Sequence, residues 1–396
     1  MALTFHRLPM AATVPSLAAF IIFILGSRRL WQSPLRYPPH IYFTTISMET
    51  TKRIAAATSS QGDLQSRTSY SSSNVLCSRE EVRQGVWVPI TLKAPPYIPL
   101  VSSCYKEHHL NGSWDTFTWQ PRGSQQGGCE FSFWDRDLFC QLAFNKTIAL
   151  LGDSLTREHY KSLVRSLGHE VARFDLRQPK NYTDQLWYDH PKGKVGYVCN
   201  GMTRIAFRRT SNLGRLNEFI TLFQPDILIL NRGAHYVSND KFINQSLPLD
   251  VKLLQMWQRK CHLQGRDCLM IWRTTVPGHP ECWKYKAPVN NRTEMEALVA
   301  NLSLYSGKLR ASFNWWNMQQ QNMLVLQVLQ KSDLIYEIMP AYDLGILRPD
   351  DHTLFKKHGI PDCLHNCDPG KADVYNQLLL HMMRLHKVEQ SLNVSL

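Results

Sequence analysis

Short apolar runs alternate with longer amphipathic segments through the C-terminal two thirds of the chain. The run Lys146–Leu151 stops abruptly at the turn Gly152-Asp153-Ser154. Apolar residues then recur at helical spacing from Leu155 to Leu167. This pattern predicts a buried strand, a tight turn and an amphipathic helix.

Later segments continue the alternation. The predicted strands are 204–207, 226–230, 269–272 and 333–336, and the predicted helices are 249–260, 295–303 and 313–331. Continuously apolar strands that alternate with helices predict an α/β fold with a doubly wound, flavodoxin-like parallel sheet. Ligands of such sheets bind beyond the carboxyl ends of the strands, so functional residues are expected in the turns that follow the apolar runs.

The N-terminal part of the chain has a different texture. Residues 1–30 contain an apolar segment, Leu8–Leu25, that predicts a short membrane signal-anchor, with a cleaved signal peptide as the alternative. Residues 31–74 are rich in Ser, Thr and Arg, which predicts a flexible stem. Residues 75–145 combine tryptophans, prolines and cysteines, and predict a loop-rich, disulfide-bonded lobe packed against a catalytic domain at 146–390.

Cysteines and glycosylation sequons indicate the compartment. The chain has ten cysteines, and its Asn-x-Ser/Thr sequons are at Asn111, Asn145, Asn181, Asn244, Asn291, Asn301 and Asn393. With the apolar N-terminus, these features favour an oxidising lumen and disulfides rather than metal thiolates. We expect some disulfides within the region from Cys77 to Cys140, and one from Cys363 or Cys367 that clamps a C-terminal loop.

The formal net charge of +13 narrows the choice of partners. A basic surface attracts anions such as acidic glycans or phospholipid headgroups, although it is equally typical of a generally basic solvated surface. There is no compact Lys/Arg block and no nucleic-acid-binding motif. A nucleic-acid partner is therefore not predicted.

Ser154 is the first candidate for chemistry. A serine at a strand-to-helix corner presents its hydroxyl beyond the edge of the sheet, among the free amides of the helix start. Those amides stabilise the negative charge that develops when an acyl carbon is attacked. Gly152-Asp153-Ser154 alone is a weak motif, because Asp or Ser before a helix is also an ordinary cap.

Asp362 and His365 provide the missing partners. They lie three residues apart, so a tight turn lets the carboxylate bond one imidazole nitrogen while the other faces outward. With Ser154 they make a set of nucleophile, base and orienting group. Cys363 and Cys367 next to His365 raise the alternative of zinc, but no matching Cys/His pair at finger spacing exists, so no metal is predicted.

Polar residues also follow two later strands. Asn231, Arg232, Gly233 and His235 come after 226–230, and Arg273 ends the run at 269–272. We expect Asn231, Gly233, His235 and Arg273, together with Gly152 and Asp153, to support an oxyanion or a substrate. For any single one of them, ordinary turn chemistry with a capping Asn is slightly the better explanation.

The ordered motifs resemble the SGNH-like esterase superfamily, and within it the trichome-birefringence-like branch of the PC-esterase family of polysaccharide O-acetyltransferases. The resemblance covers about Cys77 to Arg384. Its motifs are Cys77, Gly85-Val-Trp-Val-Pro89, Pro99-Leu100, Cys104, Trp119-Gln-Pro-Arg122, Cys129, Gly152-Asp-Ser-Leu-Thr-Arg157, Arg273, Pro277, His279 and Asp362-Cys-Leu-His-Asn-Cys367.

This resemblance implies an SGNH-like fold and a role for each motif residue. Ser154 would be the nucleophile, His365 the general base and acid, and Asp362 its orienting group, with Arg157 structural or supporting. A serine-bound acetyl group would pass to a hydroxyl of a glycan. The oxyanion would be held by the Ser154 amide with help from the region of Asn231 or Gly233.

The resemblance also implies partners and a location. The partners are a polysaccharide or glycan acceptor, the membrane through the N-terminal segment, and an acetyl donor, which is acetyl-CoA or another acetylated carrier acting as co-substrate; no bound cofactor is expected. The implied location is the Golgi membrane, single-pass type II with a lumenal catalytic domain, or alternatively secretion.

Two departures leave the acceptor open. The family usually has an Asn-Thr-Gly-His-Trp-Trp type segment where this chain has Asn231-Arg-Gly-Ala-His-Tyr236, and a His-Trp-Cys where it has His365-Asn-Cys367. An aromatic side chain that would stack on a sugar is therefore missing or moved, and xylan or pectin is not assumed. The alternatives are a carbohydrate O-acetylesterase and an inactive glycan-binding scaffold.

Overall fold

The computed structural model describes residues 75–93, 113–125, 127–168, 187–190, 193–210, 213–235, 241–305, 314–353, 362–367 and 369–394. The predicted signal-anchor and stem lie outside these residues, as do Pro99-Leu100 and Cys104. None of the described helices combines the length and the apolar character that a membrane span needs. Residues 71–396 form one compact unit.

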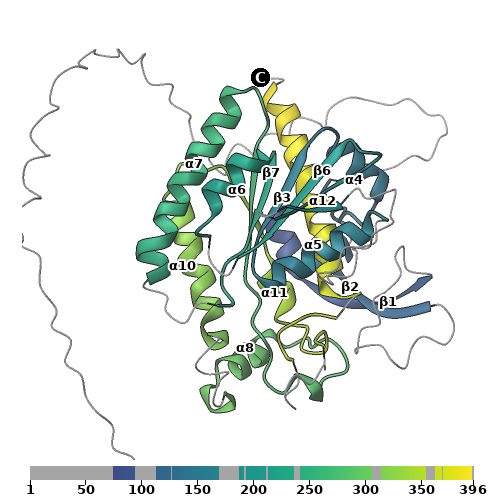
Figure 1. Cartoon of the computed structure of the whole chain (residues 1–396). Coiled ribbons are helices and arrows are strands. Elements are labelled where there is room, and N and C mark those ends of the chain that lie inside the picture. The colour runs from purple at the N-terminus through teal and green to yellow at the C-terminus, as the bar shows by residue number, and fades with distance from the viewer. Residues whose placement is uncertain are drawn as a thin grey trace, which may run out of the picture. The chain divides into compact units, whose positions relative to one another are not determined.

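A central sheet organises this unit, and in the described part of the chain its strand order is β4-β5-β6-β3-β7-β8-β9 (Figure 1). Its strands are β3 (Thr147–Gly152), β4 (Trp187–His190), β5 (Gly193–Val198), β6 (Thr203–Arg209), β7 (Ile227–Leu230), β8 (Leu269–Arg273) and β9 (Tyr336–Met339). From β6 to β9 all neighbours are parallel. The predicted α/β class is therefore confirmed, and the predicted parallel pairing holds over these five strands.

Two features of the sheet correct the prediction. Strands β4 and β5 are antiparallel to their neighbours, because β5 and β6 are joined by a tight turn in which Cys199, Asn200 and Gly201 take φ values of 55°, 56° and 83°. Strand β9 starts at Tyr336, where the predicted strand 333–336 ends. Gln258 accounts for the difference, since its side chain bonds both the N–H and the carbonyl of Ile335.

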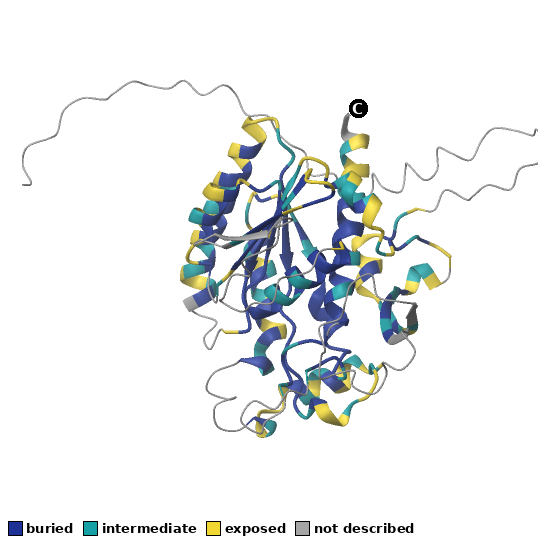
Figure 2. Cartoon of the chain, turned by 45° about the vertical axis from the view of Figure 1, so that its right-hand side comes forward, coloured by how far each residue is buried: buried dark blue, intermediate teal, exposed yellow. Residues whose placement is uncertain are grey.

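Helices cover both faces of the sheet. Helices α5 (Ser154–Ser166) and α12 (Lys371–Val394) lie on one face, and α6 (Leu216–Phe223), α7 (Leu247–Leu263) and α10 (Met318–Gln330) lie on the other (Figure 1). Alternate residues of β3 enter the two cores, Ile148 and Leu150 on the α5 side and Ala149 and Leu151 on the α7 side. The buried residues concentrate along the strands and the inner sides of these helices (Figure 2).

The predicted helices exist with shifted ends. The stretch 249–260 lies within α7, 313–331 contains α10, and 295–303 is divided between α8 (Arg292–Ala300) and a single turn at Leu302–Leu304. The remaining short helices are α2 (Arg79–Arg83), α3 (Arg122–Gln125), α4 (Arg136–Leu142), α11 (Ala341–Gly345) and single turns at Lys241–Ser246, Cys282–Lys284 and Trp315–Asn317.

The N-terminal region packs onto the same core. Strands β1 (Gly85–Lys93) and β2 (Ser113–Pro121) form an antiparallel pair, on which Trp87 and Trp119 meet edge to face. The indole N–H of Trp87 donates to the Leu344 carbonyl of the C-terminal part. As predicted, a disulfide lies within this region, Cys77–Cys129, and a second, Cys140–Cys199, ties α4 to the end of β5.

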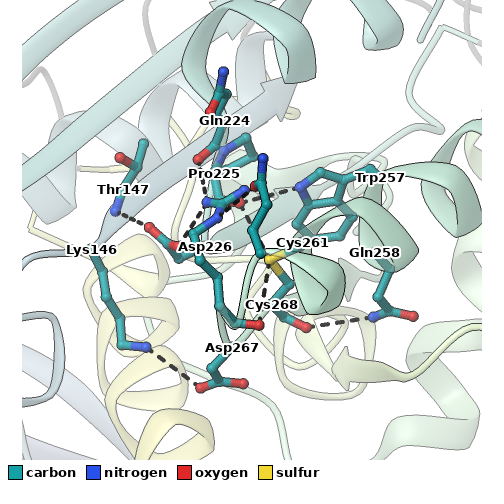
Figure 3. The surroundings of a disulfide bond; sticks show 12 residues. Lys146, Thr147, Gln224, Pro225, Asp226, Trp257, Gln258, Cys261, Asp267 and Cys268 are labelled. Atoms are coloured by element: carbon teal, nitrogen blue, oxygen red, sulfur yellow. Dashed lines mark hydrogen bonds and ion pairs between the residues drawn. A yellow bond between two sulfur atoms is a disulfide. The ribbon is translucent and has the colours of Figure 1, made fainter.

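A further disulfide, Cys261–Cys268, lies near the amino ends of the strands (Figure 3). Next to it, the Asp226 carboxylate accepts the Thr147 N–H at 2.8 Å, and the Trp257 indole donates to the Pro225 carbonyl at 3.2 Å. These bonds fix the starts of β3 and β7. The carboxyl ends of the same strands, at the opposite edge, carry the candidate site.

Candidate active site

The turn after β3 places Ser154 at the first position of α5. The Asp153 side chain caps this helix by accepting the N–H groups of Leu155 at 2.9 Å and Thr156 at 3.4 Å. A Cβ on Gly152 would lie 2.2 Å from Thr156 Oγ1, so only glycine fits before the turn. The predicted strand, turn and helix are confirmed.

His365 and Asp362 come to Ser154 from the C-terminal loop. Ser154 Oγ lies 2.9 Å from His365 Nε2, and His365 Nδ1 lies 2.7 Å from Asp362 Oδ2. The other oxygen of Asp362 accepts the N–H groups of Leu364 and His365, both at 3.2 Å. The structure thus brings together the three side chains that the sequence singles out, in the order hydroxyl, imidazole, carboxylate.

The surroundings shift the pKa values of His365 and Asp362. Burial opposes protonation of His365, but the hydrogen bond to Asp362 and the charge of Glu158 outweigh it and raise the pKa of His365. Burial favours the neutral form of Asp362, yet the same hydrogen bond lowers its pKa. Asp362 is therefore an anion that stabilises a protonated imidazole.

The nucleophile and its base differ in exposure. Ser154 is 3% exposed, whereas 30% of the His365 side chain is exposed. A molecule that reacts at Ser154 Oγ must also approach His365 Nε2, which lies 2.9 Å from that oxygen. Such a position brings it within reach of the base as well as the nucleophile.

Glu158 is a site residue that sequence reasoning missed. It lies one turn after Ser154 on α5, and its carboxylate accepts the Asn366 N–H at 3.1 Å. The loop that carries His365 is thereby attached to the helix that carries Ser154. Burial raises the pKa of Glu158, while the charge of His365 and the bond from Asn366 act against that shift.

A disulfide holds the same loop from the other side. Cys363 pairs with Cys282, whose Cα lies 5.5 Å away, and Cys367 is disulfide-bonded as well. The predicted clamp on the loop of His365 is confirmed. Asp362 and His365 lie on either side of the cross-linked Cys363, so the clamp acts directly on their backbone.

Asn231 and Gly233 connect strand ends. Both side-chain N–H groups of Asn231 are engaged, donating to the Arg273 carbonyl at 2.9 Å and to Thr275 Oγ1 at 3.1 Å. Because these donors already satisfy buried acceptors, the Asn231 side chain links the segments after β7 and β8, and oxyanion support from the region of Asn231 or Gly233 stays a prediction. At Gly233 a Cβ would lie 2.0 Å from Thr275 Oγ1, so this glycine permits the close packing of β7 and β8.

Arg273 lies beneath the nucleophile. Its guanidinium donates to the Leu155 carbonyl at 3.2 Å and to Thr156 Oγ1 at 3.0 Å, and the residue is 2% exposed. Burial lowers its pKa. Arg273 therefore holds the first turn of α5 from within the protein rather than from the substrate side, which differs from the substrate support expected of it.

Two other predicted residues lie at the margins of the site. Arg157 is half-buried on α5, and burial together with the charge of Arg209 lowers its pKa. His235 is exposed at the end of the segment that follows β7. The predicted supporting roles of both residues stay predictions.

The arrangement suits acyl transfer through serine. It supplies a hydroxyl that lies within hydrogen-bond distance of an imidazole, a carboxylate that orients the imidazole, and a serine at the first position of a helix. Among the described residues no three His, Cys, Asp or Glu side chains cluster as a metal ion would require. The described donors at this site form a proton-transfer chain rather than a ligand sphere.

Comparison with known proteins gives distant relatives over most of the chain. No family model matches. Xyloglucan O-acetyltransferase 3 of Populus trichocarpa is 21% identical over 332 residues, 73% of this chain and 80% of that protein. Xyloglucan O-acetyltransferase 4 of the same organism is 22% identical over 348 residues, 76% and 80% of the two chains. Protein trichome birefringence-like 25 of Arabidopsis thaliana is 21% identical over 377 residues, 80% and 79%.

Proposed function

We propose, from the premise that this chain is a relative of the trichome-birefringence-like proteins, that it transfers acetyl groups to hydroxyls of a polysaccharide through an acetyl-serine intermediate. The observation that carries the proposal is the hydrogen-bonded line from Ser154 through His365 to Asp362. Relatives that are named O-acetyltransferases supply the acyl group and the class of acceptor. The proposal includes an SGNH-like fold, with which the mainly parallel sheet agrees.

In the first half-reaction the acetyl group moves to Ser154. His365 Nε2 accepts the proton of Ser154 Oγ as the oxygen attacks the acetyl carbonyl, and the Ser154 N–H at the helix start stabilises the oxyanion. The bond between the acetyl carbon and the donor then breaks. His365 gives its proton to the departing group, so that the imidazole is neutral again and Ser154 carries the acetyl group.

The second half-reaction reverses these roles with a different partner. A carbohydrate hydroxyl gives its proton to His365 Nε2 and attacks the acetyl carbon, and the protonated imidazole then returns the proton to Ser154 Oγ as the ester bond breaks. Asp362 stabilises the imidazolium in both halves, because its anionic carboxylate lies 2.7 Å from Nδ1. Transfer outpaces hydrolysis when the acceptor is bound in line and displaces water.

The proposed setting is the Golgi lumen, with a membrane anchor at the N-terminus and acetyl-CoA or another acetylated carrier as donor. The disulfides of the described region support an oxidising compartment. Sequons at Asn145, Asn244, Asn291 and Asn301 fall on exposed positions, as attached glycans require.

Mass spectrometry of the lumenal part after brief exposure to p-nitrophenyl acetate tests the function. We expect one acetyl group on the peptide that contains Ser154, lost when a polysaccharide acceptor is added and recovered on that acceptor. Ser154→Ala abolishes the label, whereas Ser124→Ala keeps it, since the Ser124 hydroxyl lies on a different helix, α3, and donates to the Pro121 carbonyl. Equal loss to water with and without acceptor would instead identify an esterase, and a wild-type Ser154 that never labels would refute both enzymes.

Glu158 gives a prediction about pH. His365 must be neutral to accept a proton, and its pKa is raised in part by the charge of Glu158, so acetylation of Ser154 speeds up as pH rises through that pKa. Glu158→Gln removes the charge but keeps an acceptor for the Asn366 N–H. The pKa of His365 then falls, and the acid limb of the pH–rate profile moves to lower pH.

The matched variant Glu158→Ala separates charge from anchoring. It leaves the Asn366 N–H without its acceptor, which is expected to lower the free energy of unfolding by about 1–3 kcal/mol and to reduce the rate at every pH. Stopped-flow release of p-nitrophenol, combined with urea unfolding, measures both effects. An acid limb that stays in place in Glu158→Gln would contradict the electrostatic role.

A further inference from the structure

Two histidines that the proposed mechanism does not use are buried behind the loop of His365. His279 and His352 are 0% and 1% exposed. His279 Nδ1 lies 2.7 Å from His352 Nε2, His279 Nε2 lies 3.0 Å from the Ile346 carbonyl, and His352 Nδ1 lies 3.2 Å from the His365 carbonyl. The two rings thus form a line of contacts that ends on the backbone of His365.

The line has three contacts but only two ring protons to occupy them. Burial lowers the pKa of His279 to about 3 and that of His352 well below its usual range, and the charge of Lys371 acts in the same direction on both. Each ring is therefore neutral and carries a single N–H. Three contacts share two protons, and one proton must lie between the rings, because two nitrogen lone pairs at 2.7 Å repel each other.

The surrounding donors indicate which outer contact keeps the second proton. The His365 carbonyl already accepts the Thr353 N–H at 2.9 Å, whereas the contact at the Ile346 carbonyl is the shorter of the two outer ones. We therefore assign one proton to His279 Nε2 and the other to His352 Nε2. His352 Nδ1 then carries no proton, and its lone pair limits how closely the His365 carbonyl approaches the ring. The hydrogen bond from the Thr353 N–H holds the same carbonyl from the other direction.

We propose that the His279–His352 pair is a positioning element that fixes the backbone of His365 and, through it, the contact between His365 Nε2 and Ser154 Oγ. The inference rests on the proposed function, in which His365 is the base. The backbone of His279 reaches the loop at a second point, since its main-chain N–H donates to the Cys363 carbonyl at 2.9 Å. Both histidines act through another residue and touch no reacting atom.

The test compares His352→Leu with a matched buried histidine. His381 is 1% exposed, lies 2.7 Å from the Cys77 carbonyl and 3.1 Å from Ser132 Oγ, and has no described bond to the loop of His365. We expect His352→Leu to slow acetylation of Ser154 by p-nitrophenyl acetate about tenfold through kcat, with KM unchanged. His381→Leu lowers stability but leaves kcat of the folded protein unchanged.

A second readout does not depend on turnover. The pKa of His365, followed by NMR of the ring in labelled protein, is expected to fall in His352→Leu, because the bond to Asp362 that raises it is loosened. It stays in place in His381→Leu. His352→Gln keeps an amide where Nε2 lies and is expected to restore part of kcat; this variant replaces His352→Leu in the comparison if the leucine protein does not fold.

The outcomes are distinct. If His352→Leu and His352→Gln behave like His381→Leu in both kcat and the pKa of His365, the positioning role is overturned. If Ser154 of the wild-type protein never becomes acetylated, the proposed function fails, and the NMR comparison alone still decides whether the pair fixes His365.

Discussion

Replacing Asp362 by asparagine is expected to slow acetylation of Ser154 about 10⁴-fold while the fold is retained. One carboxylate oxygen of Asp362 accepts the backbone N–H groups of Leu364 and His365, and an asparagine oxygen accepts them equally well. The other oxygen lies 2.7 Å from His365 Nδ1. There the asparagine presents an N–H₂ group, so His365 turns its bare nitrogen inward and carries its proton on Nε2, where it no longer accepts one from Ser154.

The design separates this tautomer effect from a loss of structure. Asp135→Asn is a suitable control, because the Asp135 side chain also accepts a backbone N–H, that of Leu138, at a helix start remote from the site. Burst kinetics with p-nitrophenyl acetate and thermal unfolding of both variants give the comparison. An Asp362→Asn protein that acetylates within tenfold of the wild type would show that Asp362 does not set the tautomer of His365.

Local motifs made part of the site predictable. Ser154 was found because an apolar run that stops at a glycine defines a strand end, and strand ends of parallel sheets point at ligands. Asp362 and His365 are predictable because a spacing of three residues lets a carboxylate reach an imidazole nitrogen within one turn. The resemblance to the trichome-birefringence-like family, drawn from the same motifs, is confirmed by relatives at 20–22% identity.

Long-range contacts were not predictable in this way. Glu158 bonds a residue 208 positions away, and His352 finds its partner 73 positions away, so no sequence spacing announces either. Arg273 was singled out correctly as a strand-end cation, but only the packed structure shows that it points at the first turn of α5. Charge and position are local properties, whereas the direction of a buried side chain depends on everything packed around it.

Some misses did have a signal. Asn200-Gly201 between Val198 and Thr203 is a strong hairpin dipeptide, and it marks the antiparallel edge that the prediction of a parallel sheet overlooked. The long helix α12 is likewise absent from the predicted helices although its sequence carries a signal. Its residues Val374, Leu378 and Met382 recur every four positions and are buried against the sheet side, which is the ordinary pattern of an amphipathic helix.

The disulfide between Cys282 and Cys363 is expected to support both stability and activity. It closes a loop of 81 residues, and the loss of that constraint in the double variant Cys282→Ala/Cys363→Ala lowers the free energy of unfolding by about 4.5 kcal/mol in the chain-entropy description. Because Cys363 lies between Asp362 and His365, the variant also lets the loop that carries His365 move. Acetylation of Ser154 is therefore expected to slow about 10- to 100-fold.

The chain contains its own control for this prediction. Cys261–Cys268 spans 7 residues at the opposite edge of the sheet, so its removal is expected to cost only about 2 kcal/mol and to leave the acetylation rate of the folded protein unchanged. Urea unfolding and single-turnover acetylation of the two double variants give both quantities. Equal rates in the two variants would mean that Glu158 and the His279–His352 pair hold the loop of His365 without the clamp, and that the disulfide contributes to stability alone.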